Sequence, residues 1–521
     1  MVVVLLVMVA VIAVLAGAHW YVWRRLVHDT TRGGGAARRA GTVAILILPV
    51  LSIGALVSGR AGFPFRVQQI LAWPGFLWLV VLLYLVLWLG VGEVVRALWL
   101  RRDRRRPAAP AASGDGARRP PARPADSVST PGSSAGPESG PASPSGPETS
   151  AGPASAPASP SGPAPSSGFS GPAPAPVSAS ASGPASESAP GPVLAGTTDP
   201  TAPAPTSTPT PTPANSLPTC LDTPSAGGSA EVKAEASPGA PDAGRALSRR
   251  LFVSRAVGAG AAAAALATVG HGTHSVLRGP RIKRVTVPLA KLPRSAHGLR
   301  IAVVSDIHLG PILGRGHTRR IVDTINSAQP DLVAIVGDMV DGTVADLGTA
   351  AEPLRGLRAR HGSFFVTGNH EYYSGADEWV DHVRELGLRP LENERVEIAG
   401  GFDLAGVNDI EGENTGQGPD FVRALGDRDR SRASVLLAHQ PVVIHDAVDH
   451  GVDLQLSGHT HGGQLWPGNH LAALANPTVA GLERYGDTQL YVSRGAGAWG
   501  PPVRVGASSD ITIVQLASRQ A

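Results

Sequence analysis

The sequence contains almost no cysteine, since Cys220 is the only one in 521 residues. A disulfide within the chain is therefore impossible, and so is a zinc site built from several cysteines. The lack of disulfides leaves the compartment open, because a large domain can be stable outside the cytoplasm without them. Any metal site must use other ligands.

The chain also lacks a strong excess of one charge, with a formal net charge of +4. Arginines gather beside apolar segments, as in Arg101–Arg106, whereas acidic residues outnumber basic ones from Val285 to the end. This distribution is typical of membrane flanks and does not indicate a nucleic-acid surface. The sequence also has no stripe of arginines interleaved with aromatic residues, a pattern that would indicate nucleic-acid binding. We therefore predict no nucleic-acid partner.

Three long apolar segments lie near the N-terminus and suit membrane-spanning helices in length. They are Val2–Val22, Thr42–Ser58 and Ile70–Val91, and we predict a membrane region with three transmembrane helices over residues 1–104. A cleaved signal peptide is the alternative for the first segment. It is disfavoured because this segment lacks a basic start and two further apolar segments follow it.

The arginines between these segments indicate their orientation. They crowd the loop after the first segment and the stretch after the third, whereas the loop between the second and third carries only Arg60 and Arg66. The positive-inside rule therefore places the N-terminus outside, the first loop inside, the second loop outside and Arg101–Arg106 inside. This pattern predicts a multi-pass protein of the cell membrane.

Residues 105–247 consist mainly of Pro, Ala, Ser, Gly and Thr, with few large apolar side chains. Such a stretch cannot bury enough apolar surface to offset the entropy lost on ordering, so we predict a disordered linker. Two interpretations stay open, namely a tether or spacer between the membrane region and the segments that follow, or tolerated low-complexity sequence without a specific role.

Residues 248–272 begin with Ser248-Arg249-Arg250 and continue as an apolar segment rich in Ala and Gly. Two interpretations stay open, namely a fourth transmembrane helix or an internal segment like a twin-arginine export signal. Both place the C-terminal domain outside the cytoplasm. If the segment does not cross the membrane, that domain is cytoplasmic instead.

Residues 285–521 alternate between short apolar runs and amphipathic stretches. The runs are typical of buried strands, and stretches such as His317–Ala328 and Asp377–Leu386 are typical of helices. This alternation predicts an α/β domain with sheets covered by helices. The predicted strands are Ile301–Val304, Leu332–Val336, Phe364–Val366, Leu404–Val407, Val435–Leu437, Leu454–Leu456, Leu490–Val492 and Ile511–Val514.

Polar residues of the metal-ligand type follow five of these predicted strands. Because α/β sheets place ligand sites at the carboxyl ends of their strands, these residues are expected to meet at one rim. Residues two apart in an extended segment point the same way, so each Asp-x-His or His-x-His pair can reach one site. The blocks are Ser305-Asp306-Ile307-His308, Gly337-Asp338, Gly368-Asn369-His370-Glu371, Ala438-His439 and Gly458-His459-Thr460-His461-Gly462-Gly463-Gln464.

The residue types in these blocks indicate the kind of ion. A mixed Asp, Asn and His set suits Mn, Fe or Zn and does not suit an all-oxygen Ca or Mg site. The glycines of the blocks, at positions 337, 368, 458, 462 and 463, are predicted to let the backbone turn tightly beside the ions.

The five blocks, in this order, resemble those of the calcineurin-like metallophosphoesterases. The last block is most similar to the bacterial membrane-associated branch of that family, which includes the YkuE-type phosphoesterases and is similar to the UDP-diacylglucosamine pyrophosphatases of lipid A synthesis. The resemblance covers the chain from about Val285 to Leu516. It implies an αββα sandwich, where the residue pattern alone predicts only an α/β domain.

The resemblance also implies two divalent metal ions and a ligand set for each. By the family pattern the ligands are Asp306, His308 and His461 for the first ion, Asn369, His439 and His459 for the second, and Asp338 for both. His370 would act without ligating, by stabilising the transition state or protonating the leaving oxygen. The alternative for His370 is a purely structural place at a helix start, with Asn369 as the cap.

These residues predict a metal-dependent hydrolase of a phosphoester or pyrophosphate bond, in which a water activated between two ions attacks phosphorus. Its partners would be the membrane and a phosphorylated small-molecule or lipid substrate of the cell envelope. Its catalytic domain would lie outside the cytoplasm. The alternative is a non-catalytic membrane sensor or scaffold with a metal-containing ligand-binding domain. Intact Asp306, Asp338 and His370 weigh against that alternative.

Overall fold

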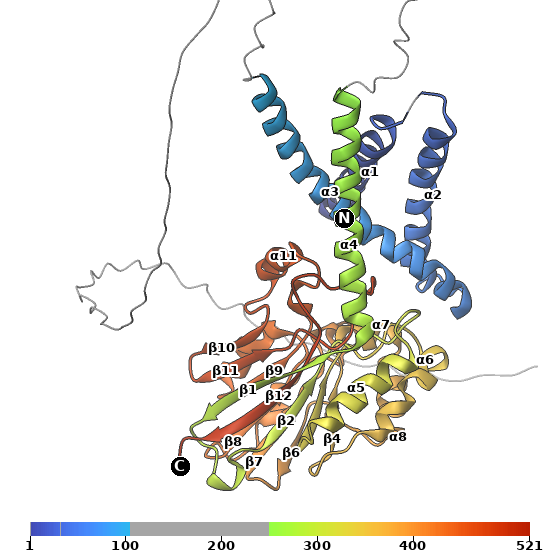
Figure 1. Ribbon diagram of the computed structural model, residues 1–521. Helices are drawn as coiled ribbons and strands as arrows, with labels where there is room; N and C mark the ends of the chain where they lie inside the picture. The colour runs from blue at the N-terminus through green and yellow to red at the C-terminus, as the bar shows by residue number, and fades with distance from the viewer. Residues whose placement is uncertain (1, 32, 105–248, 521) are drawn as a thin grey trace, which may run out of the picture. The chain divides into compact units, whose positions relative to one another are not determined.

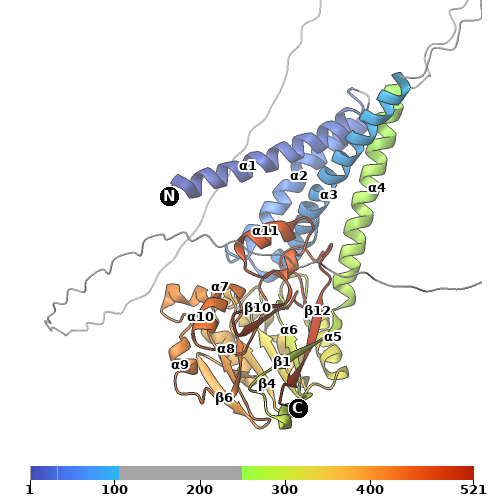
Figure 2. The same cartoon turned by 90° about the vertical axis from the view of Figure 1, so that its left-hand side faces the viewer.

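The computed structural model describes residues 2–31, 33–104 and 249–520. The disordered linker predicted over residues 105–247 therefore lies outside the described residues. The described ranges pack together as one unit, which contains long apolar helices and an α/β domain. Figures 1 and 2 show these elements in two views.

The three predicted N-terminal segments are all helical. They are α1 (Val2–Val22), which continues as a π-helical turn over Trp23–His28, α2 (Ala36–Ser58) and α3 (Phe65–Arg104). Apolar side chains on these helices are exposed, since Leu6, Val14 and Val50 are between 63% and 71% exposed. Surfaces of this kind are costly in water and suit contact with lipid. By length and composition, each of these helices can cross a membrane.

Helices α2 and α3 approach closely at a small residue. A Cβ on Gly75 of α3 would meet the carbonyl oxygen of Leu51 and the Cβ of Ala55, both on α2. The hydroxyl of Ser52 donates a hydrogen bond to the carbonyl of Gly75 over 2.8 Å. Small residues and hydroxyl groups are the usual means by which helices associate in lipid.

A fourth long helix, α4 (Arg249–Arg278), connects directly to the C-terminal domain. It too is apolar and long enough to cross a membrane, and it packs against α3 through Ala261, Ala265 and Val269. Only Gly279 and Pro280 separate it from the first strand. The fourth predicted apolar segment is thus a continuous helix that ends at the edge of the domain.

The C-terminal domain contains two sheets of six strands each. The first is parallel except where β12 runs antiparallel to β2. The second is parallel at its centre and ends in an antiparallel hairpin at each edge. In order, the first sheet contains β1 (Arg281–Leu289), β12 (Asp510–Ser518), β2 (Arg300–Val304), β3 (Leu332–Val336), β4 (Ser363–Val366) and β5 (Arg389–Pro390), and the second contains β10 (Gly481–Tyr485), β11 (Thr488–Val492), β9 (Leu454–Ser457), β8 (Ala433–Leu437), β7 (Phe402–Gly406) and β6 (Glu394–Ile398).

The two sheets pack face to face, with helices on both outer faces. Alternation along β2 shows why, because Ile301 and Val303 enter the core between the sheets whereas Ala302 and Val304 face the outer helices. The predicted αββα sandwich is therefore confirmed (Figures 1 and 2). The first sheet is covered by α5 (Arg315–Ser327), α6 (Val344–Ala351) and α8 (Ala376–Glu385), and the second by α9 (Phe421–Leu425) and α10 (Ile444–Asp449).

Two short helices, α7 (Asn369–Ser374) and α11 (Gly468–Ala475), lie toward the end of the sandwich nearest α4 in both views.

Each of the eight predicted strands is present, with ends shifted by a few residues. Strands β1, β5, β6 and β10 were not predicted, because they lie at sheet edges where charged residues interrupt the apolar pattern, or span only two residues.

One buried histidine of the helical layer gives the domain a pH-dependent stability. His317 of α5 is 2% exposed, and within the described residues neither of its ring nitrogens makes a hydrogen bond. Burial, together with nearby Arg320 and Arg504, lowers the pKa of His317 to about 3. The unfolded chain takes up this proton near pH 6.5, so stability is full above that pH and falls as the pH drops toward 3, by at most about 1.4 kcal/mol per pH unit.

We therefore expect His317→Gln to remove this acid sensitivity. The melting temperature of the wild-type chain, measured in detergent by intrinsic fluorescence, should fall relative to that of the variant between pH 7.5 and pH 5. His445→Gln, at an exposed position of α10, is the matched control and should follow the wild type. A difference between wild type and His317→Gln that stays constant with pH would contradict this account.

Candidate metal centre

The predicted polar blocks lie where five strands end. Those that follow β2, β3 and β4 come from the first sheet, and those that follow β8 and β9 come from the second. The two sheets face each other, so loops from both meet at one end of the sandwich. The structure brings the seven predicted ligands together there in two groups.

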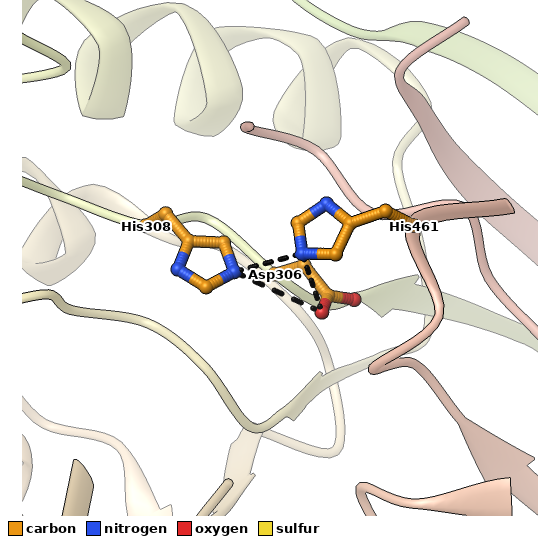
Figure 3. Close-up of side chains that lie close together, drawn as sticks. All are labelled: Asp306, His308 and His461. Atoms are coloured by element: carbon orange, nitrogen blue, oxygen red, sulfur yellow. Dashed lines mark hydrogen bonds and ion pairs between the residues drawn. The ribbon is translucent and has the colours of Figure 1, made fainter. Parts of the chain in front are cut away.

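The first group consists of Asp306, His308 and His461, whose ligand atoms all lie within 4.8 Å of one another. Nε2 of His461 is 3.3 Å from Oδ1 of Asp306 and 2.9 Å from Nε2 of His308. Figure 3 shows the two rings and the carboxylate converging on one point. All three residues are buried.

The second group consists of Asp338, His439 and His459, also within 4.8 Å of one another, together with Asn369 beside His459. Nε2 of His439 is 3.1 Å from Oδ2 of Asp338, and Nδ1 of His459 is 3.1 Å from Oδ1 of Asn369. The same Oδ2 of Asp338 lies 3.7 Å from Nε2 of His308 in the first group. One carboxylate therefore lies between the two groups.

The outer ring nitrogens of His439 and His308 each face an oxygen atom. Nδ1 of His439 is 2.9 Å from the carbonyl oxygen of Val336, which can only accept, so His439 carries its proton there. Its buried Nε2, on the other side of the ring, faces Oδ2 of Asp338. Nδ1 of His308 likewise faces Oδ1 of Asp341 at 2.8 Å. Holding the outer nitrogen in this way orients the inner one for a metal.

The charges of the cluster also fit a pair of divalent cations. Burial lowers the pKa of His459 to about 4 and holds the pKa of His461 well below its usual value, and the nearby His439 and His308 act in the same direction. Both rings are therefore neutral at pH 7, as metal ligation requires. Burial raises the pKa of Asp338, but His439 and then His308 outweigh it and hold that pKa well below the usual range.

Known proteins are similar to this chain in sequence. A sequence model of the family described as calcineurin-like phosphoesterase matches residues 299–463. An uncharacterized metallophosphoesterase of Helicobacter pylori is 39% identical over 257 residues, an alignment that covers 48% of this chain and 68% of that protein. The chain belongs to the calcineurin-like metallophosphoesterase family.

Other relatives place the metallophosphoesterase domain in different protein contexts. A protein of Danio rerio named "Transmembrane protein with metallophosphoesterase domain" is 39% identical over 259 residues, which is 47% of this chain and 59% of that protein. The uncharacterized metallophosphoesterase YkuE of Bacillus subtilis is 30% identical over 285 residues, which is 52% of this chain and 98% of that protein. The chain thus spans about three-fifths of the Danio rerio protein, and what that whole protein does is not carried over.

The metallophosphoesterase site concentrates backbone strain. Eight residues other than glycine have positive φ angles in the described part of the chain, and five of them are predicted ligands. Residues other than glycine rarely adopt this left-handed backbone conformation. Each such residue costs about 1–3 kcal/mol of stability unless its surroundings hold it in place. The five are Asp306 (φ 53°), His308 (φ 48°), Asp338 (φ 52°), His459 (φ 70°) and His461 (φ 53°).

The glycines of the ligand loops serve two purposes. Gly337 has a φ of 73°, so the predicted tight turn is present there. At Gly368 and Gly458 the reason is space instead, because a Cβ would collide with the carboxylate of Asp338 or of Asp306. Gly368 has an ordinary φ of −109°, and it is the N-cap of α7, a place that the structural alternative for His370 assigned to Asn369.

Glu371 holds the second ligand loop in place. Its buried carboxylate accepts hydrogen bonds from the backbone N–H groups of Gly368, Asp338 and Met339, over 2.6, 2.9 and 2.7 Å. These bonds tie the start of α7 to the strained backbone at Asp338. Glu371 thus positions the backbone of the ligand loops.

We expect Glu371→Gln to destabilise the protein, because the amide nitrogen would face N–H donors in place of an acceptor. A buried donor left without a partner costs about 1–3 kcal/mol, which corresponds to a fall in melting temperature of roughly 2–12 °C. Thermal unfolding of the full chain in detergent measures this change. Glu378→Gln, at an exposed position of α8, is the control. Equal melting temperatures for both variants would show that the three hydrogen bonds carry no stability.

The sequence interpretation missed Asp341. Its Oδ1 lies 2.8 Å from Nδ1 of His308 and 2.7 Å from Nδ1 of His370, so one carboxylate oxygen joins a predicted ligand to the predicted catalytic histidine. Burial lowers the pKa of His370, but the hydrogen bond and charge of Asp341 outweigh it and raise that pKa to about 9. His370 therefore carries a proton at neutral pH. A signal was present, since Asp341 follows Asp338 in the same loop.

Arg504 was missed as well, and no local signal indicates it. It is 2% exposed and precedes β12 in the chain. Its guanidinium donates a hydrogen bond to the carbonyl oxygen of His461 over 3.0 Å and a second to the carbonyl oxygen of Ala507 over 3.2 Å. Arg504 thereby helps to hold the strained backbone conformation of His461.

Proposed function

We propose that this metallophosphoesterase hydrolyses a phosphoester or pyrophosphate bond with two divalent cations. The observation that carries the proposal is the carboxylate of Asp338, whose Oδ2 lies within 3.7 Å of a histidine nitrogen of each group. Mn, Fe or Zn suits this set of ligands. Two such cations, when bound, would neutralise charge on the phosphate and lower the pKa of a shared water.

The residues around the two groups supply positioning and a proton. Asp306, His308 and His461 would hold one cation, Asn369, His439 and His459 the other, and Asp338 both. His370 is the second residue of α7, and its backbone N–H donates to Oδ1 of Asp338 over 3.0 Å. We assign it the role of general acid, in which Asp341 holds the Nδ1–H and the proton on Nε2 passes to the leaving oxygen.

A cavity beside the second group offers room for the remainder of a substrate. Its volume is about 420 Å³, and Asn369 and His459 of the second group form part of its wall. Tyr373, Glu411 and Gln440 provide hydrogen-bonding groups on the same wall. These features suit the polar part of a phosphorylated small molecule or of a lipid head group.

The experiment that tests this function measures metal and hydrolysis together. The full chain, purified in lipid nanodiscs, should contain two divalent cations and hydrolyse an aryl phosphate in the presence of Mn. A chelator should abolish hydrolysis, and added Mn should restore it. A metal-loaded chain that hydrolyses the aryl phosphate, a phosphodiester and a pyrophosphate only at background rates would instead support a sensor or scaffold that binds a ligand without cleaving it.

Four apolar helices and a transmembrane relative support association with the membrane. We propose a multi-pass topology in which α4 emerges on the outer side and carries the domain there. A pair of reporters fused after Ala521 tests the side, one active only outside the cytoplasm and one active only within it. Activity of the cytoplasmic reporter alone would overturn this topology.

A further inference from the structure

An exposed apolar surface borders the metal centre. We define this apolar rim by Trp466, Leu471, Leu474 and Trp499, which are 51%, 72%, 84% and 55% exposed. Leu471 and Leu474 belong to α11. In the described part of the chain, no residue of α11 is buried. The two segments that carry the rim, 465–482 and 495–503, contain no Asp, Glu, Lys or Arg. Exposed leucine and tryptophan side chains without interspersed charge mark a surface that contacts something apolar.

The apolar rim is joined directly to the catalytic residues. The ring of Trp499 packs edge-on against the ring of His370, with 5.9 Å between their centroids. Gln464 ties the two rim segments together, since its amide donates to the carbonyl of Trp499 and accepts from the N–H of that residue. Gln464 follows the ligand His461 by a single turn. Whatever covers the rim therefore lies beside the mouth of the metal site.

The rim segments also contact an apolar helix. The hydroxyl of Tyr84, on α3, donates a hydrogen bond to the carbonyl of Trp466 over 2.9 Å. Gly500, next to Trp499, faces the ring of Phe76 on α3. Leu465 and Val503 pack in the same cluster as residues of α3 and α4. Phe76 and Tyr84 lie inside the apolar span of α3, so the rim begins at a segment suited to lipid.

We propose that the apolar rim inserts into the surface of the membrane that holds the four helices, so that the metal site opens at the level of the lipid head groups. Leu471 and Leu474 of α11 would enter the boundary between head groups and acyl chains, as interfacial helices do to a depth of about 5–10 Å. Trp466 and Trp499 would lie at that boundary, where tryptophan is enriched. This placement needs no knowledge of the substrate.

Connectivity favours lipid over another protein as the occupant. The domain begins two residues after α4 ends, which keeps its near end close to the membrane whatever else binds. Both α7 and α11 lie at that end in the two views (Figures 1 and 2). A protein partner or a second copy would have to compete there with lipid that is always present. A lipid surface is therefore the occupant that the fold itself supplies.

The test measures depth in the membrane with a fluorescent probe. Because Cys220 is the only cysteine, Cys220→Ser gives a background in which Leu471→Cys and Leu474→Cys can each carry one environment-sensitive fluorophore. Val422→Cys, on α9 and 70% exposed, is the matched control away from the rim, and Leu266→Cys, on α4 and 59% exposed, is the control within a span. The full chain is placed in nanodiscs with lipids that carry a nitroxide quencher near the ester end or near the methyl end of the acyl chain.

We expect probes at positions 471 and 474 to lose most of their fluorescence with the ester-end quencher and less with the methyl-end quencher. The probe at 266 should respond to the methyl-end quencher, and the probe at 422 to neither. A response at 471 and 474 that equals the response at 422 would overturn the proposal. A blue-shifted emission at 474 that grows with protein concentration and resists both quenchers would also overturn it, because it would show that protein covers the rim.

Discussion

Asp338→Asn should reduce hydrolysis by at least about 10³-fold, because each of two cations stabilises the transition state by several kcal/mol and about 1.4 kcal/mol is a factor of ten. The Oδ2 atom of Asp338 lies 3.7 Å from His308 and 3.1 Å from His439, so one oxygen serves both groups. The asparagine side chain offers one oxygen and no charge. It can keep the hydrogen bond from the backbone N–H of His370 but cannot serve both cations. We therefore also expect fewer than two cations per chain, measured by elemental analysis of the purified protein.

Asp427→Asn, at an exposed side chain of the same domain, is the control for Asp338→Asn and should leave rate and metal content unchanged. Melting temperatures of both variants separate lost chemistry from lost folding. If Asp338→Asn retained two cations and a wild-type rate, a shared carboxylate could not be the centre of the site. The assignment of Asp338 as a bridging ligand would then fall, whereas the fold would be unaffected.

The sequence predicted that these side chains would meet because each predicted ligand follows a buried strand. The apolar residues of β2 and β3 identify those strands, and Asp306 and Asp338 lie just beyond them. Once the strands are parallel neighbours, their carboxyl ends must meet. What the pattern could not predict is the positive φ angles at these residues, since the backbone at Asp338 and at His461 is held by hydrogen bonds to Glu371 and Arg504, which are distant in sequence.

Contacts between segments far apart in the chain account for the other omissions. Arg504 reaches His461 across 43 positions of sequence, and nothing in its own neighbourhood distinguishes it from a surface arginine. Helix α11 was not predicted, because a short segment of Leu and Ala without charges has no polar face to give it a period. Whether this helix is exposed depends on how the rest of the domain packs around it.

Asp341→Asn should lower kcat about 10²-fold, within the range for losing a general acid, and change KM by less than about twofold. Oδ1 of Asp341 lies 2.7 Å from Nδ1 of His370, where its charge favours the protonated ring. A neutral asparagine leaves the ring in place but removes that charge, so fewer His370 side chains carry the proton that the leaving oxygen needs. Steady-state kinetics with an aryl phosphate measure both constants, and Asp346→Asn, at an exposed position of α6, is the control.

Asp341 also contacts His308, so the same substitution has a second possible consequence, which is weaker binding of the first cation. Metal content separates the two, because loss of the proton on His370 leaves two cations per chain whereas a disturbed His308 does not. A double-mutant cycle gives a further test. If Asp341 acts through His370, adding Asp341→Asn to a His370→Ala chain should lower kcat by less than about twofold, since residues that act as a unit are not additive. Full additivity, or a loss of metal that parallels the loss of kcat, would assign Asp341 to the first metal group and leave His370 without a positioning residue.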